Sequence, residues 1–150
     1  MSGIYVKPGD EVRFSKTVGE SDVYLFAGIT GDLSYNHVNE EFMRKSSYGR
    51  RIAHGALMVG FMSTASTMMI DFAKGTEGDE TPVSLGYDRI RFLAPVFIGD
   101  TITVTYRITG VDAARRRSTS DIAITNQNGE LVTVGSHVLK WVPNVAQAAE

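Results

Sequence analysis

The chain has 150 residues, a formal net charge of -2 at pH 7 and a hydrophobic fraction of 43%, so it can bury the core of one domain. It contains no cysteine, which excludes disulfides, thiolate metal sites and a cysteine nucleophile. Its 15 basic and 17 acidic side chains balance, so the overall charge does not indicate nucleic-acid binding. The sequence contains no internal repeat and no linker, and we expect a single domain spanning residues 1–150.

The N-terminal residues do not follow the pattern of a secretory signal. They lack a cationic start followed by an apolar stretch, so a cytoplasmic location is expected. An N-terminal strand is expected over residues 12–18.

Helices are expected in the first half of the chain. Ser21 and Asp22 can cap a short helix that ends near residues 28–31, and Asn39 can cap a second one that begins with two glutamates. Residues 28–37 lie between them and consist mainly of glycines and polar turn formers, which predicts a loop.

A third and longer helix is expected from about His54-Gly55 to Phe72. Residues 52–70 contain no Asp, Glu, Lys or Arg and are about as long as a bilayer span. Their content of His, Gly, Ser and Thr makes them too polar to prefer lipid. We therefore predict a helix buried inside the protein and no contact with a membrane.

Strand patterns dominate the second half of the chain. The segment Thr101–Thr109 alternates polar and apolar residues and predicts the clearest strand, with one face toward the core. Residues 83–92 predict an earlier strand. Residues 121–125 and 131–141 flank a turn-forming segment and predict a hairpin. Helices followed by strands favour the α+β class with an antiparallel sheet.

One arrangement suits a long helix with almost no charge. Such a helix needs protein around most of its circumference, and an antiparallel sheet wrapped around it would provide this. That arrangement is the hot-dog fold. The pattern alone leaves ferredoxin-like and other α+β layouts open, since they also pair sheets with helices.

The predicted loop holds two residues that can carry acid–base chemistry. Asp32 and His37 lie five positions apart, and an irregular loop can fold both into one cleft. A carboxylate and an imidazole form a natural pair for moving a proton near neutral pH. In the alternative interpretation, Asp32 makes an Asx-type turn and His37 is a satisfied polar residue near Asn39.

The following residues resemble those of a known family, the MaoC-like dehydratases or (R)-specific enoyl-CoA hydratases. The match is in the order and spacing of Gly31-Asp32, His37, Glu41-Phe42, Gly49-Arg50, Ile52-Ala53-His54-Gly55 and the segment Arg91–Thr101. The resemblance implies a hot-dog domain, an antiparallel sheet around a long central helix. It also implies a hydro-lyase that reversibly hydrates trans-2-enoyl-CoA to (R)-3-hydroxyacyl-CoA. Between its Asp and His the family has Asn, Pro and an aliphatic residue, whereas this chain has Ser34, Tyr35 and Asn36.

The resemblance also suggests roles for individual residues. Asp32 and His37 would be the catalytic pair that shares one water molecule. Gly55 would offer its backbone N–H to the thioester oxygen at the positive end of the long helix, or would only permit close packing against the sheet. Ser63 would line the acyl pocket, unless its hydroxyl bonds its own helix. A helix N-terminus disfavours a charged imidazole, so we expect His54 to be a neutral residue of the substrate-binding site that orients the loop of the catalytic pair.

Neither a metal ion nor a cofactor is expected. The substrate would be a thioester of CoA or of acyl carrier protein, and neither nucleic acid nor membrane is an expected partner. The resemblance implies a homodimer, or a dimer or trimer of such dimers, with the cleft at the subunit interface. A hot-dog thioesterase and a non-catalytic acyl-CoA-binding protein are the alternatives, and the pairing of Asp32 with His37 favours the hydratase.

Overall fold

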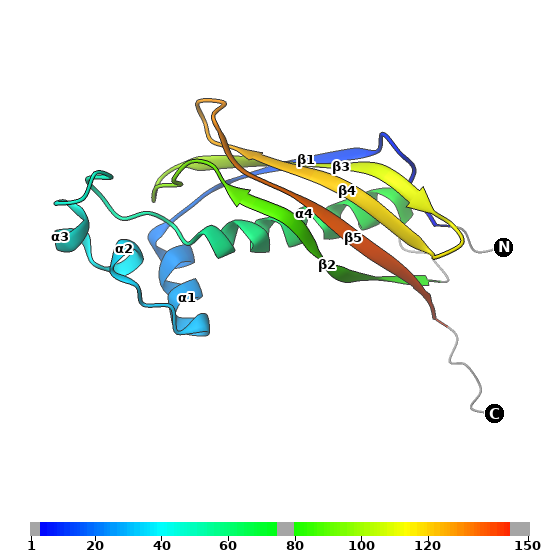
Figure 1. Cartoon of the computed structure of the whole chain (residues 1–150), viewed down its shortest axis with the longest axis horizontal. Coiled ribbons are helices and arrows are strands. Elements are labelled where there is room, and N and C mark those ends of the chain that lie inside the picture. Colours follow the sequence, from blue (N-terminus) through cyan, green and yellow to red (C-terminus); the bar gives the residue numbers. More distant parts are fainter. Residues whose placement is uncertain (1–3, 75–79, 145–150) are drawn as a thin grey trace.

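The computed structural model describes residues 4–74 and 80–144, which form one antiparallel sheet, one long helix and three shorter helices. The sheet has five strands in the order β1-β3-β4-β5-β2 and curves over the long helix α4 (Figure 1). This architecture confirms the predicted α+β class and the hot-dog fold. In chain order the elements are β1 (Glu11–Thr17), α1 (Glu20–Thr30), α2 (Tyr35–Val38), α3 (Glu40–Met43), α4 (Gly55–Lys74), β2 (Glu80–Phe92), β3 (Thr101–Asp112), β4 (Arg117–Thr125) and β5 (Leu131–Pro143).

All five predicted strands are present, and most are longer than predicted. In β3 the alternation continues as expected, with Val104, Tyr106 and Ile108 buried. Strand β4 begins at Arg117 rather than at Asp121, and the hairpin to β5 turns where expected, at residues 126–130. Strand pairing therefore extends beyond the segments that hydrophobic alternation marks.

The short helices differ from prediction at their starts. Helix α1 is capped at Gly19 rather than at Ser21 or Asp22, because the Asp22 carboxylate accepts a hydrogen bond from the Gly19 N–H at 2.8 Å. Asn39 caps α3 as predicted, with its side chain accepting from the Phe42 N–H. The expected loop also contains one helical turn, α2, which carries His37.

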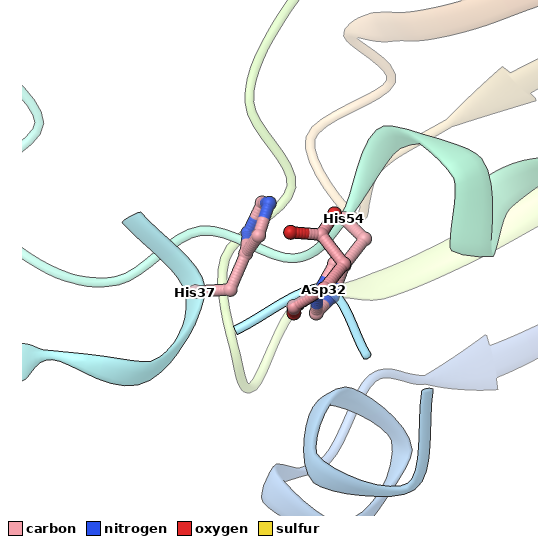
Figure 2. A group of neighbouring side chains, drawn as sticks. All are labelled: Asp32, His37 and His54. Carbon is pink, nitrogen blue, oxygen red and sulfur yellow. The ribbon is translucent and has the colours of Figure 1, made fainter. Parts of the chain in front are cut away.

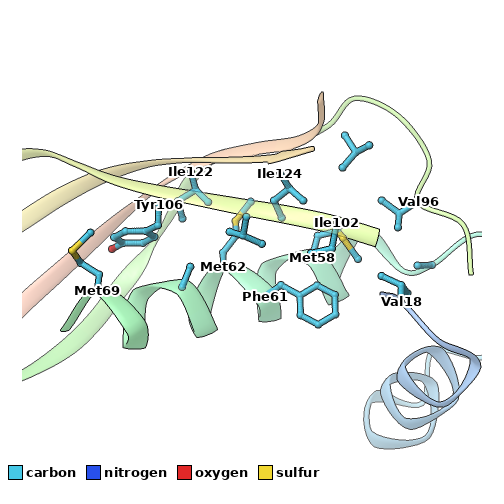
Figure 3. Packing of buried hydrophobic residues seen from close by; sticks show 14 of the residues in the cluster. Val18, Met58, Phe61, Met62, Met69, Val96, Ile102, Tyr106, Ile122 and Ile124 are labelled. Atoms are coloured by element: carbon cyan, nitrogen blue, oxygen red, sulfur yellow. The ribbon is translucent and has the colours of Figure 1, made fainter. Parts of the chain in front are cut away.

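Helix α4 packs one side against the sheet (Figure 3). Its inward side chains include Met58, Phe61, Met62, Ala65 and Met69, all of which are buried. The opposite side carries small residues, among them Gly60, Ser63, Thr64 and Thr67, and these are exposed. The helix is thus covered on one side by its own chain rather than on most of its circumference. Among the described residues it is also the one helix long and apolar enough to span a membrane, and it serves here as the core helix.

Arg51 joins the short helices to the segment that precedes α4. Its side chain pairs with Glu20 of α1 and, at 2.9 Å, with Glu40 of α3. The hydrogen bonds that Arg51 donates to the carboxylates of Glu20 and Glu40 raise the pKa of Arg51 above its usual value. This ion-pair cluster holds α1 and α3 at the end of the molecule where α4 begins.

Candidate active site

Four of the predicted site residues lie together at the N-terminal end of α4. Asp32 comes from the loop after α1, His37 from α2, and His54 and Gly55 from the start of α4 (Figure 2). The nitrogen and carboxylate atoms that Asp32, His37 and His54 offer all lie within 4.8 Å of one another. The fold thus gathers three segments of the chain at one helix terminus.

The backbone of Ile52 holds the His37 ring and also the residue before it. Its Nδ1 lies 2.8 Å from the carbonyl oxygen of Ile52, and a carbonyl can only accept, so Nδ1 carries the proton. The Ile52 N–H in turn donates to the carbonyl of Asn36 at 3.0 Å. In a neutral ring this leaves Nε2 with a free lone pair, the form that a general base requires.

Burial controls the charge of His37. The side chain is 8% exposed, and loss of hydration lowers the pKa of His37 below its usual value. The nearby imidazole of His54 lowers it further, while the Ile52 carbonyl and the Asp32 carboxylate act in the opposite direction. Overall the pKa of His37 is lowered, so the ring is neutral near pH 7.

Asp32 is exposed and is positioned by hydrogen bonds of its side chain and of its backbone. Its Oδ1 accepts from the Ser34 N–H at 3.3 Å, which is the Asx-type turn of the alternative interpretation. The Asp32 backbone carbonyl accepts from Nε2 of His54 at 3.0 Å. Among the described residues the side-chain hydrogen bonds of Asp32 involve Oδ1 alone, so the turn is compatible with a second role for Oδ2.

The rings of His37 and His54 stack, with centroids 3.7 Å apart and an angle of 27° between their planes. Asp32, His37 and His54 are the one group of side chains within residues 4–74 and 80–144 that could hold a metal ion. Stacked rings, however, direct their in-plane lone pairs side by side rather than toward one point. The geometry therefore suits hydrogen bonding to water better than metal coordination.

Gly55 begins α4 and lies against the ring of Phe92. The first N–H groups of a helix have no acceptor within the helix, and they form the positive end of its dipole. A Cβ on Gly55 would lie 2.8 Å from carbon atoms of the Phe92 ring, so a side chain does not fit there without movement. The absence of a side chain at Gly55 therefore permits close packing of α4 against Phe92. The backbone N–H of Gly55 lies at the start of the helix.

A pocket of about 350 Å³ lies at this helix terminus. Its polar wall holds Asn36, His37, Tyr48 and His54. Its apolar wall comes mainly from Met58, Phe92, Leu93, Ala94, Pro95 and Val96. Such a cavity can hold a small apolar group beside an imidazole and a helix N-terminus.

Ser63 lies elsewhere. It is exposed and lies two turns further along α4, near the Tyr87 hydroxyl. Burial raises the pKa of Tyr87, and the interaction with Ser63 acts in the opposite direction. Asn36, Tyr48 and Phe92 line the pocket instead, and they were not predicted as site residues. Only Asn36 had a signal in the sequence, since it replaces an aliphatic residue of the family pattern.

Comparisons with known proteins agree with this fold. The chain is 38% identical to an (R)-specific enoyl-CoA hydratase of Rhodospirillum rubrum over 106 residues, which cover 71% of this chain and 68% of the relative. It is 31% identical to a 3-hydroxybutyryl-CoA dehydratase of Methylorubrum extorquens, with 89% and 78% covered. The crystal structure of an (R)-hydratase from Aeromonas caviae involved in PHA biosynthesis superposes with a TM-score of 0.77 at 27% identity, covering 90% of this chain and 96% of that one.

The match to a family model is equally extensive. The model described as "MaoC like domain" matches residues 5–129, which is most of the chain. The resemblance found in the sequence is thereby confirmed, and the chain belongs to the MaoC-like domain family.

Proposed function

We propose that this protein is a hydro-lyase that reversibly adds water to trans-2-enoyl-CoA and forms (R)-3-hydroxyacyl-CoA. The observation that carries the proposal is the state of His37, a residue of the pocket lining, whose Nδ1–H is held by the Ile52 carbonyl so that Nε2 of the neutral ring is left as an acceptor. The names of the hydratase and dehydratase relatives support the same reaction.

In the proposed mechanism one water molecule lies between His37 and Asp32. Nε2 of His37 accepts one hydrogen of the water and the free carboxylate oxygen of Asp32 accepts the other. As the proton moves to Nε2, the water oxygen forms a bond to the β-carbon and the π electrons shift toward the thioester oxygen. The imidazolium then returns the proton to the α-carbon, which restores the neutral ring and completes the addition.

The negative charge that develops on the thioester oxygen needs a donor. We assign this role to the backbone N–H of Gly55, at the positive end of α4. Removing one such donor typically costs about 3 kcal/mol of transition-state stabilisation. The proposed chemistry requires neither a metal ion nor a redox cofactor, because a carboxylate, an imidazole and a helix terminus supply every step.

We propose that His54 supports Asp32 and His37 by holding them in position. Its Nε2–H bonds the Asp32 carbonyl and its ring stacks on His37, so it fixes the distance between the two reacting groups. We regard His54 as a positioning residue, and Ser63 as a contact of the acyl chain only if the pocket is extended by a second subunit.

We further propose a homodimer in which β2 faces β2 of a second copy. Strand β2 lies at one edge of the sheet, and its Val83 and Leu85 are exposed. The other edge, β1, carries Glu11, Arg13 and Lys16, the kind of charged residues that discourage edge pairing, whereas residues 81–87 of β2 include no charged side chain. A second copy along β2 would also cover the exposed small-residue side of α4. We keep the cytoplasm as the expected location.

Incubation with crotonyl-CoA tests the proposed function. Loss of the enoyl-thioester absorbance without release of free thiol is expected. Release of thiol without hydration would identify a thioesterase, and binding without either reaction would identify a non-catalytic acyl-CoA-binding protein. Asp112→Asn provides a matched control for substitution of Asp32, because Asp112 is only partly buried and is the last residue of β3, whose C-terminal end lies far from α1 (Figure 1).

A further inference from the structure

Asn36, one of the residues that line the pocket, has a buried side-chain acceptor without a hydrogen-bond partner. The residue lines the pocket next to His37, and its side-chain oxygen Oδ1 is buried without a hydrogen bond. Native structures rarely keep a buried amide acceptor unpaired unless a ligand or water completes it. An aliphatic residue, as in the family pattern, would not create this demand. The pocket therefore calls for a ligand with an N–H or O–H donor near Asn36.

The position of Asn36 does not depend on its own side chain. Its backbone carbonyl accepts the Ile52 N–H at 3.0 Å, and the Ile52 carbonyl accepts from His37 at 2.8 Å. These two bonds fix Asn36 and His37 against the same neighbouring residue. The Asn36 carboxamide is thereby held one residue away from the imidazole that acts on the substrate.

The pocket wall around Asn36 is suited to the polar part of a thioester. Tyr48, another polar lining residue, is 48% exposed, whereas Asn36 is half-buried and His37 is buried. Phe92 and residues 93–96 supply apolar lining. An acyl group fits the apolar wall, and the arm that leads from the sulfur toward solvent fits the polar one.

We propose that Asn36 positions the substrate by accepting a hydrogen bond from the amide N–H of the pantetheine arm nearest to the thioester sulfur. This inference rests on the proposed function. The acyl part of a simple 2-enoyl thioester contains no N–H or O–H donor. The first donor of the substrate is the amide that follows the sulfur after two methylene groups, and CoA and acyl carrier protein share this arm. Asn36 is therefore a positioning residue for either form of the substrate.

Two small thioesters and one variant test the proposal. S-Crotonyl-N-acetylcysteamine carries the amide N–H, and S-pentyl thiocrotonate has a similar length without it. For Asn36→Leu we expect the KM for the first compound to rise about 5- to 10-fold with little change in kcat, since the bond forms equally in ground and transition states. The kinetics with S-pentyl thiocrotonate should be unchanged. Asn128→Leu, in the turn between β4 and β5 and outside this pocket, is the control.

Two results would overturn the inference. An equal loss with both thioesters would assign Asn36 to the catalytic water or to the loop, and unchanged kinetics with both would show that the donor lies elsewhere. The thermal midpoint should not fall in Asn36→Leu, because the variant removes an unpaired buried acceptor.

Binding of unreactive butyryl-CoA separates this inference from the proposed function. If the wild type binds butyryl-CoA but hydrates none of the thioesters, the proposed function fails. A rise of about 5- to 10-fold in the dissociation constant for Asn36→Leu would then still support the role of Asn36. Equal binding of butyryl-CoA by both proteins would refute it.

Discussion

Gly55→Ala tests the close contact between the start of α4 and the end of β2. The added Cβ would lie 2.8 Å from the Phe92 ring, whereas ordinary contacts begin at 3.4 Å. The ring must therefore retreat by about 0.6 Å, the difference between these two distances. Phe92 is 55% exposed, so the ring can turn toward solvent instead of disrupting the core. Overpacking typically costs about 1–3 kcal/mol, and we expect the lower end of this range.

A double-mutant cycle isolates the contact. Alanine has a helix propensity about 1 kcal/mol better than glycine, which would partly hide the steric cost in a single variant. Introducing Gly55→Ala into both the wild type and Phe92→Ala cancels this contribution. Urea denaturation followed by circular dichroism should give a coupling energy of about 1 kcal/mol between the two positions. Gly28→Ala, in α1 and with open space around it, should be neutral or stabilising.

The wild type, Gly55→Ala, Phe92→Ala and the double variant also separate the effect on packing from the effect on catalysis. In Gly55→Ala the displaced Phe92 ring moves within the pocket that it lines, so kcat/KM for crotonyl-CoA should fall at least about tenfold. In the Phe92→Ala background the same substitution should have little effect, because the backbone N–H of residue 55 is retained. The steric reasoning is refuted if Gly55→Ala costs the same stability in both backgrounds. A hydration rate that stays low in the double variant would contradict the packing explanation of the activity loss.

Three further predictions concern titratable groups. Asp32→Asn and His37→Ala should each remove most hydration, by about 100-fold or more, without changing the denaturation midpoint by more than about 1 kcal/mol; near wild-type rates would contradict the catalytic pair. Burial lowers the pKa of His37, so the acidic limb of the pH–rate profile should lie below pH 6.5, and an inflection above this value would contradict the neutral base. Burial also lowers the pKa of His137 to about 4. Because its folded pKa lies below the unfolded value of about 6.5, the unfolded state binds more protons and stability falls as the pH decreases from 6.5 to 4; denaturation midpoints across this window should show the decrease in the wild type and a smaller one in His137→Gln.

Strand positions could be predicted from the sequence wherever apolar residues fill the inward positions. The segment Thr101–Thr109 is the clearest example, since its apolar positions are the buried ones. The start of β4 could not be found in this way, because the inward side chains there are Ser118 and Ser120. Ser118 accepts a hydrogen bond from the indole N–H of Trp141 at 3.2 Å, so polar partners replace apolar contacts. Hydrophobic alternation does not detect strands that are buried through hydrogen bonds.

The residues of the candidate site also differ in whether the sequence could predict them. Asp32 and His37 could be predicted because their chemistry and spacing are local features of the chain. Phe92 could not, because its role depends on a contact between the end of β2 and the start of α4. For Ser63, the sequence correctly predicted a place on α4, but the pocket of the single chain does not extend to this residue. Contacts between distant elements, which a single sequence does not reveal, decide these cases.

Four consecutive residues, Ile52 to Gly55, organise the whole site. Ile52 orients the His37 ring, Ala53 donates its N–H to the Val96 carbonyl at 2.7 Å, His54 bonds the Asp32 carbonyl, and Gly55 begins α4. The contact of Ala53 ties this segment to the strand connection that forms the apolar wall of the pocket. The imidazole, the carboxylate and the helix N–H groups are thus all positioned from one anchored segment. Their relative geometry depends on contacts within a few residues of the helix start, which explains how a loop of glycines and polar residues can hold Asp32 and His37 close together.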